Sequence, residues 1–401
     1  MNRAAPGQTP LAERSYVLAI LGAHLAFMPL FALLLPRRVN DIAPGSAVAV
    51  LSWLLLVGGI VASVAHIAAG KLSDHWFARV GQRRGLVGIG TAAVVGAYLF
   101  FAWATDIGSL FAAMIIFQLA LNLMFAPLGA MLADHVADDR KGRVAAMMNS
   151  ALPLSAIGTT LAALLFPRDG AGGFLFIAAL SASAAIPLIV APRFATASAA
   201  PIDVAPARPM AWPDFARVWA ARLLMQSGAA FLLNFFYLFV ASRPAVTGLA
   251  ASRAFGILAA LSMIASVSAA LLAGSWSDKR RTRRWPMIGG ALACALSLAI
   301  LAAADSWPMM ILGYVLFNAG LTTFLSADSA LVAQLLGHHP RRGEYLGYMN
   351  LTNTLPAIVV PALALGVLAR TPQLDWSLGF SCAAMLALAA GLLVTQIRTI
   401  D

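Results

Sequence analysis

Two ionisable side chains stand deep inside apolar stretches of this 401-residue chain. Of the 16 acidic residues, Asp328, between FLSA and SALVAQLL, is the one that lies well inside an apolar stretch. Of the 27 basic residues, Arg222 is the one that lies well inside such a stretch. An unpaired carboxylate near the centre of a membrane helix costs about 2.5–3.5 kcal/mol. Burial favours its protonated form and a nearby cation favours its ionised form. Asp328 therefore has the chemistry of a proton carrier, and Arg222 that of its counter-ion.

His24 is the third titratable candidate. At about 1.5 Å of helix per residue, His24, Arg222 and Asp328 lie at similar depths, about 9–12 Å from the ends of their apolar stretches. Because the unperturbed pKa of histidine is near neutral, His24 can relay or gate a proton. Three alternatives stay open: Asp328 in a wet vestibule where it does not titrate, Arg222 extended towards lipid headgroups, and His24 as a hydrogen-bonded core residue.

Neutral amides form a second group of candidates. They both donate and accept hydrogen bonds, so they can bind hydroxyl groups without requiring charge on a ligand. Aromatic rings nearby can stack on the apolar face of a sugar. The alternative is hydrogen bonding between membrane helices, for which each single amide is equally suited. The amides are Gln118, Asn122, Gln226, Asn234, Asn318, Asn350 and Asn353, and the aromatics are Phe235, Phe236, Tyr237 and Tyr348.

Twelve apolar stretches must position these residues. About 20 apolar residues span the hydrocarbon core, and 61% of the chain is hydrophobic while only 11% is charged. We predict an all-α polytopic membrane protein with twelve transmembrane helices in two pseudo-symmetric six-helix halves. The expected spans are 16–36, 46–70, 85–104, 109–133, 144–166, 172–191, 216–241, 251–273, 285–304, 307–335, 343–369 and 375–397.

The charges define the topology. The net charge of +11 comes mainly from Lys and Arg in the loops on the side of the N-terminus, which places both termini in the cytoplasm. This distribution argues against a nucleic-acid partner and favours contact with anionic membrane lipid. The Ala/Pro-rich segment 192–215 is predicted to be a mobile surface linker between halves 1–191 and 216–401.

Two loops repeat about half the chain apart. Each carries Gly-x-x-x-Asp and then an Arg pair, between the second and third spans of its half. Gly70 is expected to end a helix and admit a neighbouring helix, Asp74 to accept from helix amides, and the Arg pair to bridge nearby acids, as a conformational latch. Asp134 is assigned to this latch rather than to a cavity. Alternatively, topology alone holds these charges there. The residues are Gly70, Asp74, Arg83, Arg84, Gly274, Asp278, Arg283 and Arg284.

These loops resemble the signature of the major facilitator superfamily, and the resemblance extends over the whole chain. Three segments are similar to the glycoside/sucrose-type cation symporters: GKLSDHWFARVGQRR, DRKGRVAAMMN and GEYLGYMNLTNTLP. His66 and Ile67 depart from that pattern. The span-five motif of drug/proton antiporters is absent from ALPLSAIGTTLAALL, which favours uptake. The resemblance implies that spans one, four, seven and ten line a central cavity, which would bring His24, Arg222 and Asp328 together.

The function expected from these observations is proton-coupled symport. The sequence has no phosphate-binding loop and no hydrolase or zinc motif, so we assign no catalytic residue, cofactor or metal and do not expect an enzyme. The expected partners of a monomer in a bacterial inner membrane are protons and a small neutral hydroxylated solute such as a sugar. The alternatives are a proton-driven efflux antiporter for drugs or metabolites, and a non-transporting receptor or assembly factor of the same fold.

Overall fold

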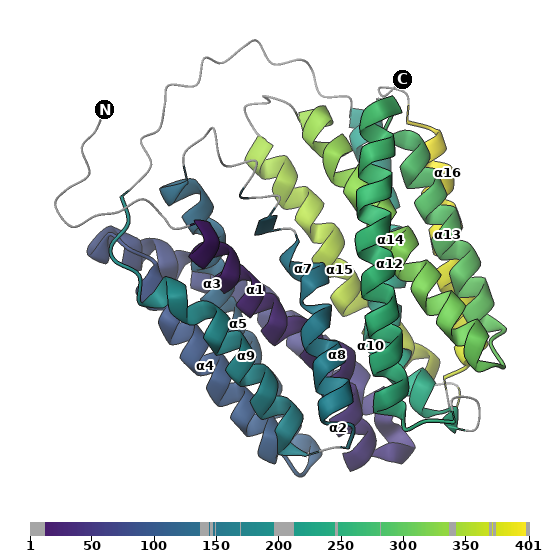
Figure 1. Ribbon diagram of the computed structural model, residues 1–401, viewed down its shortest axis with the longest axis horizontal. Helices are drawn as coiled ribbons and strands as arrows, with labels where there is room; N and C mark the ends of the chain where they lie inside the picture. The colour runs from purple at the N-terminus through teal and green to yellow at the C-terminus, as the bar shows by residue number, and fades with distance from the viewer. Residues whose placement is uncertain are drawn as a thin grey trace. The chain divides into compact units, whose positions relative to one another are not determined.

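The protein is described by a computed structural model. The structure describes residues 13–136, 144, 147–148, 150–168, 170–195, 212–244, 248–280, 282–336, 342–368, 371 and 374–397. Its contacts divide the chain into two compact units, Met1–Ile202 and Asp203–Asp401, called the first and second half below (Figure 1). Each half is described by itself.

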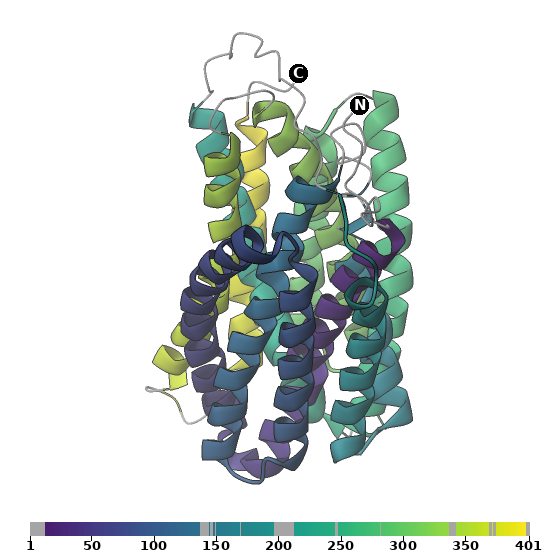
Figure 2. The ribbon, with the colours of Figure 1, turned by 90° about the vertical axis from the view of Figure 1, so that its left-hand side faces the viewer.

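The first half is a helical bundle (Figure 2). Its first span is continuous from Glu13 to Ile42 and contains a π-helical turn directly after Pro29, where proline removes a backbone donor. The elements are α1 (Glu13–Pro29), η1 (Leu30–Leu34), α2 (Leu35–Ile42), η2 (Pro44–Ser46), α3 (Ala47–Val80), α4 (Arg84–Trp103), α5 (Ile107–His135), α7 (Ala151–Leu154), α8 (Ala156–Leu165) and α9 (Ala171–Ile189).

The second half consists of six long helices in its described residues. They are α10 (Trp212–Ala241), α12 (Ala251–Arg280), α13 (Arg284–Ala302), α14 (Trp307–Leu336), α15 (Arg342–Leu368) and α16 (Trp376–Thr395).

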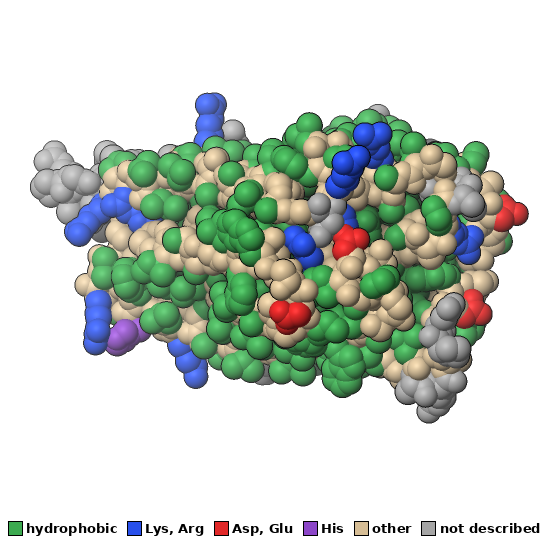
Figure 3. All heavy atoms as spheres, turned by 90° about the horizontal axis from the view of Figure 1, so that it is seen from below, with side chains coloured by type: hydrophobic (Ala, Val, Ile, Leu, Met, Phe, Trp, Pro, Cys, Tyr) green, Lys and Arg blue, Asp and Glu red, His purple; other side chains and the backbone are tan. Residues whose placement is uncertain are grey.

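Within the described residues, 11 helices are long and apolar enough to cross a membrane. The fifth predicted span, 144–166, is described only in part: the short helices α7 and α8 meet at Ser155, and the 10 residues of α8 fall below spanning length. Hydrophobic side chains dominate the face seen in Figure 3. The chain is therefore a multi-pass membrane protein, as predicted.

The two halves use the same packing scheme. In the first half α4 packs against α5 and α9, α3 against α5, and α1 against α9. In the second half α13 packs against α14 and α16, α12 against α14, and α10 against α16. The sequence repeat thus corresponds to a repeat of helix contacts, which confirms the fold class.

A glycine permits the same close helix crossing in each half. A Cβ built on Gly90 of α4 would lie 2.7 Å from the backbone nitrogen of Met124 on α5. A Cβ built on Gly290 of α13 would lie 2.6 Å from the carbonyl oxygen of Gly320 on α14. Backbone atoms cannot move aside as a flexible side chain can, so these crossings require glycine.

An arginine closes the opposite end of each bundle. Arg38 donates to the carbonyl oxygen of Ala102 at 3.1 Å, and its guanidinium lies over the ring of Phe174. Arg243 donates to the carbonyl oxygen of Ala304, which follows the end of α13. Carbonyls at a helix end lack an intrahelical donor, and these side chains supply one. No sequence motif singled out either arginine for this role.

Two predicted boundaries are wrong for a physical reason. The segment from Gly70 to Asp74 is helical, because α3 continues to Val80 and ends at Gly81, whose φ of +70° is left-handed. A Cβ on Gly70 would meet no described atom within 4 Å, so Gly70 neither ends the helix nor admits a neighbour. The backbone from Gly274 to Asp278 likewise belongs to α12; the side chains of 274–280 lie outside the described part.

The predicted linker also changes at both edges. Residues 212–215 belong to α10. At the other edge Phe194 is buried in the first half, where its backbone exchanges hydrogen bonds with the side chain of Gln82. Residues 196–211 lie outside the described part of the chain.

The glycine crossing gives a paired prediction. Gly290→Ala should lower the free energy of unfolding by about 1–3 kcal/mol, because the added methyl group strikes backbone. Gly289→Ala should leave stability unchanged or slightly higher, since a Cβ there meets no atom within 4 Å. Thermal unfolding of both purified variants in detergent measures the difference. Equal midpoints would show that the crossing tolerates a side chain.

Candidate functional site

The second half contains a buried ion pair between α10 and α14. Arg222 Nη1 donates to Asp328 Oδ2 at 2.7 Å. Asp328 is fully buried, and its second oxygen, Oδ1, has no hydrogen-bond partner in the described structure. The expected contact between Arg222 and Asp328 is confirmed, and the expectation that His24 joins them stays a prediction. The carboxylate is compensated in charge but keeps one oxygen free for a proton.

Amide side chains continue from the arginine along α10 and α15. Gln226, one helical turn after Arg222, donates from Nε2 to Asn353 Oδ1 at 2.6 Å. Asn353 in turn donates from Nδ2 to Asn350 Oδ1 at 3.3 Å. Asn350 and Asn353 are exposed. Three of the predicted solute-binding amides therefore form one hydrogen-bonded row next to the ion pair.

The other second-half candidates lie in the aromatic core or bond their own helix. Phe236 stacks on Tyr314 with ring centroids 4.2 Å apart, and Tyr237 packs edge-on against Phe255. Asn318 donates to the carbonyl oxygen of Tyr314 at 2.8 Å. Phe235 and Asn234 are also buried, and Tyr348 is exposed. In this conformation the rings pack on one another, so their stacking on a sugar stays a prediction.

The first half holds a separate polar group. Asn122 donates to the backbone oxygen of Gln118 at 2.8 Å, and its own Oδ1 lies 3.0 Å from Nδ1 of His66. In the sequence, His66 stands out only as a departure from a family pattern. No sequence signal linked it to Asn122, because the two residues belong to different helices, α3 and α5.

His24 is also in the first half. Its Nδ1 lies 2.9 Å from the carbonyl oxygen of Ile20, and its ring meets Phe125 edge-on. Because a carbonyl only accepts, Nδ1 carries the proton and Nε2 is the basic nitrogen of the neutral ring. The relay role assigned to His24 stays a prediction.

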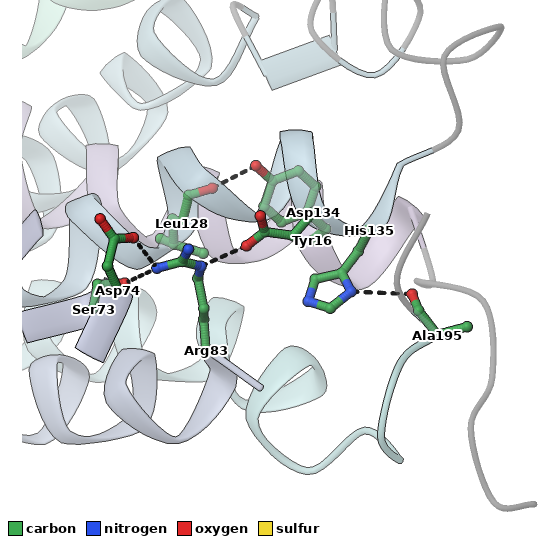
Figure 4. Close-up of polar contacts among 8 residues, drawn as sticks. All are labelled: Tyr16, Ser73, Asp74, Arg83, Leu128, Asp134, His135 and Ala195. Atoms are coloured by element: carbon green, nitrogen blue, oxygen red, sulfur yellow. Dashed lines mark hydrogen bonds and ion pairs between the residues drawn. The ribbon is translucent and has the colours of Figure 1, made fainter. Parts of the chain in front are cut away.

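Arg83 organises the end of the first half where α3, α4 and α5 meet (Figure 4). Its Nε donates to Asp134 at 2.5 Å, and its Nη1 contacts Asp74 at 2.9 Å and the Ser73 hydroxyl at 2.6 Å. The guanidinium also lies 4.7 Å from the ring centre of Phe77. Arg83 thus holds three helix ends together, and Asp74 pairs with this arginine.

The rest of the proposed latch differs from this pattern. Arg84 Nη1 lies 3.5 Å from the carbonyl oxygen of Ile189 at the end of α9. In the second half Arg284 donates to the carbonyl oxygen of Thr395 at the end of α16. The second arginine of each pair therefore contacts the last helix of its half. Arg283 precedes α13, and the surroundings of Gly274 and the side chain of Asp278 lie outside the described part of the chain.

Removing the two acids that flank Arg83 should have unequal effects. The Asp74 side chain is 74% exposed, so Asp74→Asn should cost about 1 kcal/mol or less. The Asp134 side chain is 20% exposed and faces a buried guanidinium, so Asp134→Asn should cost about 3 kcal/mol. Thermal unfolding of both variants in the same detergent checks the order. Reversal of that order would mean that the solvent-facing pair holds the helix ends.

Comparison with known proteins supports the fold. Residues 242–399 match the sequence model of the Major Facilitator Superfamily, a match confined to the second half. None of the curated protein sequences is significantly similar to the chain.

Solved transporter structures resemble the chain along nearly its full length. A variant of the nucleoside transporter NupG is 14% identical, with a TM-score of 0.68 over 96% of this chain and 100% of that one. A POT family transporter in complex with 5-aminolevulinic acid is 12% identical, with a TM-score of 0.73 over 96% of each chain. A variant of the peptide transporter POT is 13% identical, with a TM-score of 0.74 over 98% of this chain and 96% of that one. The chain is thus a multi-pass membrane protein with the major facilitator fold.

Proposed function

We propose that this protein is a secondary transporter of the major facilitator superfamily that carries a small neutral hydroxylated solute, such as a sugar, together with protons. The observation that carries the proposal is the Arg222–Asp328 ion pair with its free carboxylate oxygen. The two six-helix halves would alternate access to a site in the membrane.

The ion pair suits reversible proton binding. A buried carboxylate that lacked a cation would be costly to keep ionised, and one with all its lone pairs bonded would resist protonation. Asp328 is between these limits, since Arg222 donates to Oδ2 and Oδ1 has no partner among the described residues. A proton arriving at Oδ1 would neutralise the carboxylate and weaken its bond to Arg222.

Protonation of Asp328 would favour solute binding. Arg222 would keep its charge after Asp328 is neutralised, and a buried cation without an acceptor is unfavourable. A solute hydroxyl can accept from the guanidinium while Gln226 and Asn353 bond its other hydroxyl groups. Proton and solute thus stabilise each other's binding, which is the thermodynamic requirement for symport.

The further assignments follow the same proposal. His24, Gln118 and Asn122 supply the first half's polar groups, and Asn234, Tyr237, Asn318 and Asn350 complete the second half's set. Segments 1–191 and 216–401 are the two moving halves, joined by 192–215. In this proposal the transporter is a monomer in a bacterial inner membrane with both termini in the cytoplasm, an orientation that the basic loops favour.

A liposome assay tests the coupling. When sugars, polyols and nucleosides are added outside proteoliposomes, one of them should acidify the lumen in the presence of the wild-type protein. Asp328→Asn should abolish this proton entry, because an amide cannot carry a proton across the cycle. A lumenal pH indicator measures both. Asp328→Glu, which keeps a titratable group, should retain part of the coupling.

Two results would contradict the proposal. Proton entry that persists with Asp328→Asn would exclude Asp328 as the carrier. If no solute of the panel drives entry but a lipophilic drug or metabolite moves protons in the opposite sense, the protein is an efflux antiporter.

The ion pair also predicts a stability pattern. Arg222→Gln should cost about 3–5 kcal/mol, because it leaves a buried carboxylate without its cation. Arg222→Gln combined with Asp328→Asn should recover most of that loss, since two neutral amides can bond each other. Thermal unfolding of the single and double variants measures the coupling. Purely additive losses would show that the two side chains do not act as a pair.

A further inference from the structure

A cavity of about 230 Å³ opens at one end of the first half, outside the transport site proposed above. It is lined by the last turn of α3, the start of α4 and the end of α9 with the residues that follow it. These helices belong to the candidate spans Pro44–Val80, Arg84–Trp103 and Ala171–Ile189, all of which end here. The headgroup layer extends several ångström beyond the hydrocarbon core, so a cavity at the ends of these spans is within reach of lipid headgroups.

The polar part of the wall is basic. Arg84 and Arg193 both line the cavity, and none of its described lining residues is acidic. Asp74 and Asp134, at the same end of the bundle, are paired with Arg83. Within the described structure, Arg84 makes a long contact of 3.5 Å with the Ile189 carbonyl. The positive charge of this wall is thus available to an anion.

The wall is also held in place before any ligand arrives. Gln82 donates to the carbonyl oxygen of Phe194 at 2.8 Å and accepts from its amide at 3.2 Å. His135 on α5 lies 3.1 Å from the carbonyl oxygen of Ala195 (Figure 4). Because the residues after Arg193 are fixed on both sides, this arginine is presented on an anchored backbone.

A hydrogen-bond donor without a partner lines the same cavity. Trp76 Nε1 is shielded from solvent and bonds to nothing in the described structure. A Cβ built on Gly85 would lie 3.3 Å from the indole ring, so the ring is packed against the start of α4. The N-terminus of a helix offers further amide donors and a positive dipole. The donors and charges together match the oxygens of a phosphate group.

The remaining wall is apolar and continues onto the surface. Val80 and Ile189 line the cavity. Ile186 and Val190, on the neighbouring turn of α9 and just after it, are 50% and 73% exposed. A free phosphate ion gains nothing from this surface, whereas an acyl chain buries it.

We propose that this cavity binds the headgroup phosphate of an anionic phospholipid, with Arg84 and Arg193 pairing the phosphate, Trp76 donating from its indole N–H, and the acyl chains lying along α9. Basic pockets between membrane helices are suited to such headgroups. The site lies in one half and does not depend on the proposed solute or proton.

A lipid titration of the full chain in detergent tests the site. The midpoint of thermal unfolding should rise with phosphatidylglycerol and not with phosphatidylcholine or inorganic phosphate at equal concentration. Arg84→Gln combined with Arg193→Gln should raise the half-maximal phosphatidylglycerol concentration roughly 25-fold, about 5-fold for each basic side chain at an anionic surface. Trp76→Phe keeps an aromatic ring packed against Gly85 but removes the indole N–H. It should raise the half-maximal phosphatidylglycerol concentration about 10-fold, because one hydrogen bond to the charged phosphate is lost.

The matched control is Lys71→Gln combined with Arg79→Gln. It removes the same charge from exposed positions on α3 outside the cavity, so the half-maximal concentration should stay at the wild-type value. If the control raises the half-maximal concentration as much as the Arg84/Arg193 variant does, general surface charge explains the binding and the proposed site is wrong. Equal stabilisation by phosphatidylcholine, or by inorganic phosphate alone, would overturn the anionic-lipid assignment. If Trp76→Phe has the wild-type half-maximal phosphatidylglycerol concentration, the indole N–H does not bind the phosphate and that part of the proposal is wrong.

Discussion

The structure depends on satisfying charge where water is scarce. In the second half this is done inside the bundle, where Arg222 and Asp328 neutralise each other at 2.7 Å. A buried pair of this kind adds little stability relative to a well-packed apolar pair. It does leave one carboxylate oxygen without a hydrogen-bond partner among the described residues, where a proton could bind. This ion pair adds little to stability and leaves one carboxylate oxygen able to take up a proton. The combination points to a functional role rather than a structural one.

Polar groups at the ends of the bundles must also be satisfied, and there arginine side chains do this by binding backbone carbonyls and carboxylates. Arg38, Arg243 and Arg284 donate to carbonyl oxygens at or just beyond helix ends, and Arg83 collects two carboxylates and a hydroxyl. Helix ends carry carbonyls with no intrahelical donor, so arginine serves both as a topology signal and as a structural tie. The equivalent positions in both halves show that this use belongs to the repeated scaffold.

The sequence predicted what long apolar runs and burial costs determine. Helix type and the repeat follow from run length and spacing, and the similar depth of Arg222 and Asp328 from their positions in the runs. That these two side chains meet was implied by the family resemblance. Contacts that depend on the direction of a side chain could not be predicted from the sequence. The contacts of His66 with Asn122 and of Gln82 with Phe194 are examples, because each joins residues far apart in the chain. The end of α3 was misplaced because Lys71 and Asp74 resemble a loop in composition, although a charged helix can extend into water. Gly81, with its left-handed φ, is the residue that ends it.

The halves share packing but not chemistry in their described residues. Close crossings at Gly90 and Gly290 recur at matching positions, as backbone geometry demands. Among the described residues, the buried Arg222–Asp328 pair belongs to the second half, while the first half has the Asn122 amide beside His66, and His24 on α1. The repeated scaffold thus carries a buried ion pair at one position that its counterpart does not share. Under the proposed function, protonation of Asp328 would change the charge beside Arg222 in one bundle, so that a proton would affect a solute bound there through Arg222 and the neighbouring amides rather than through every polar group at once.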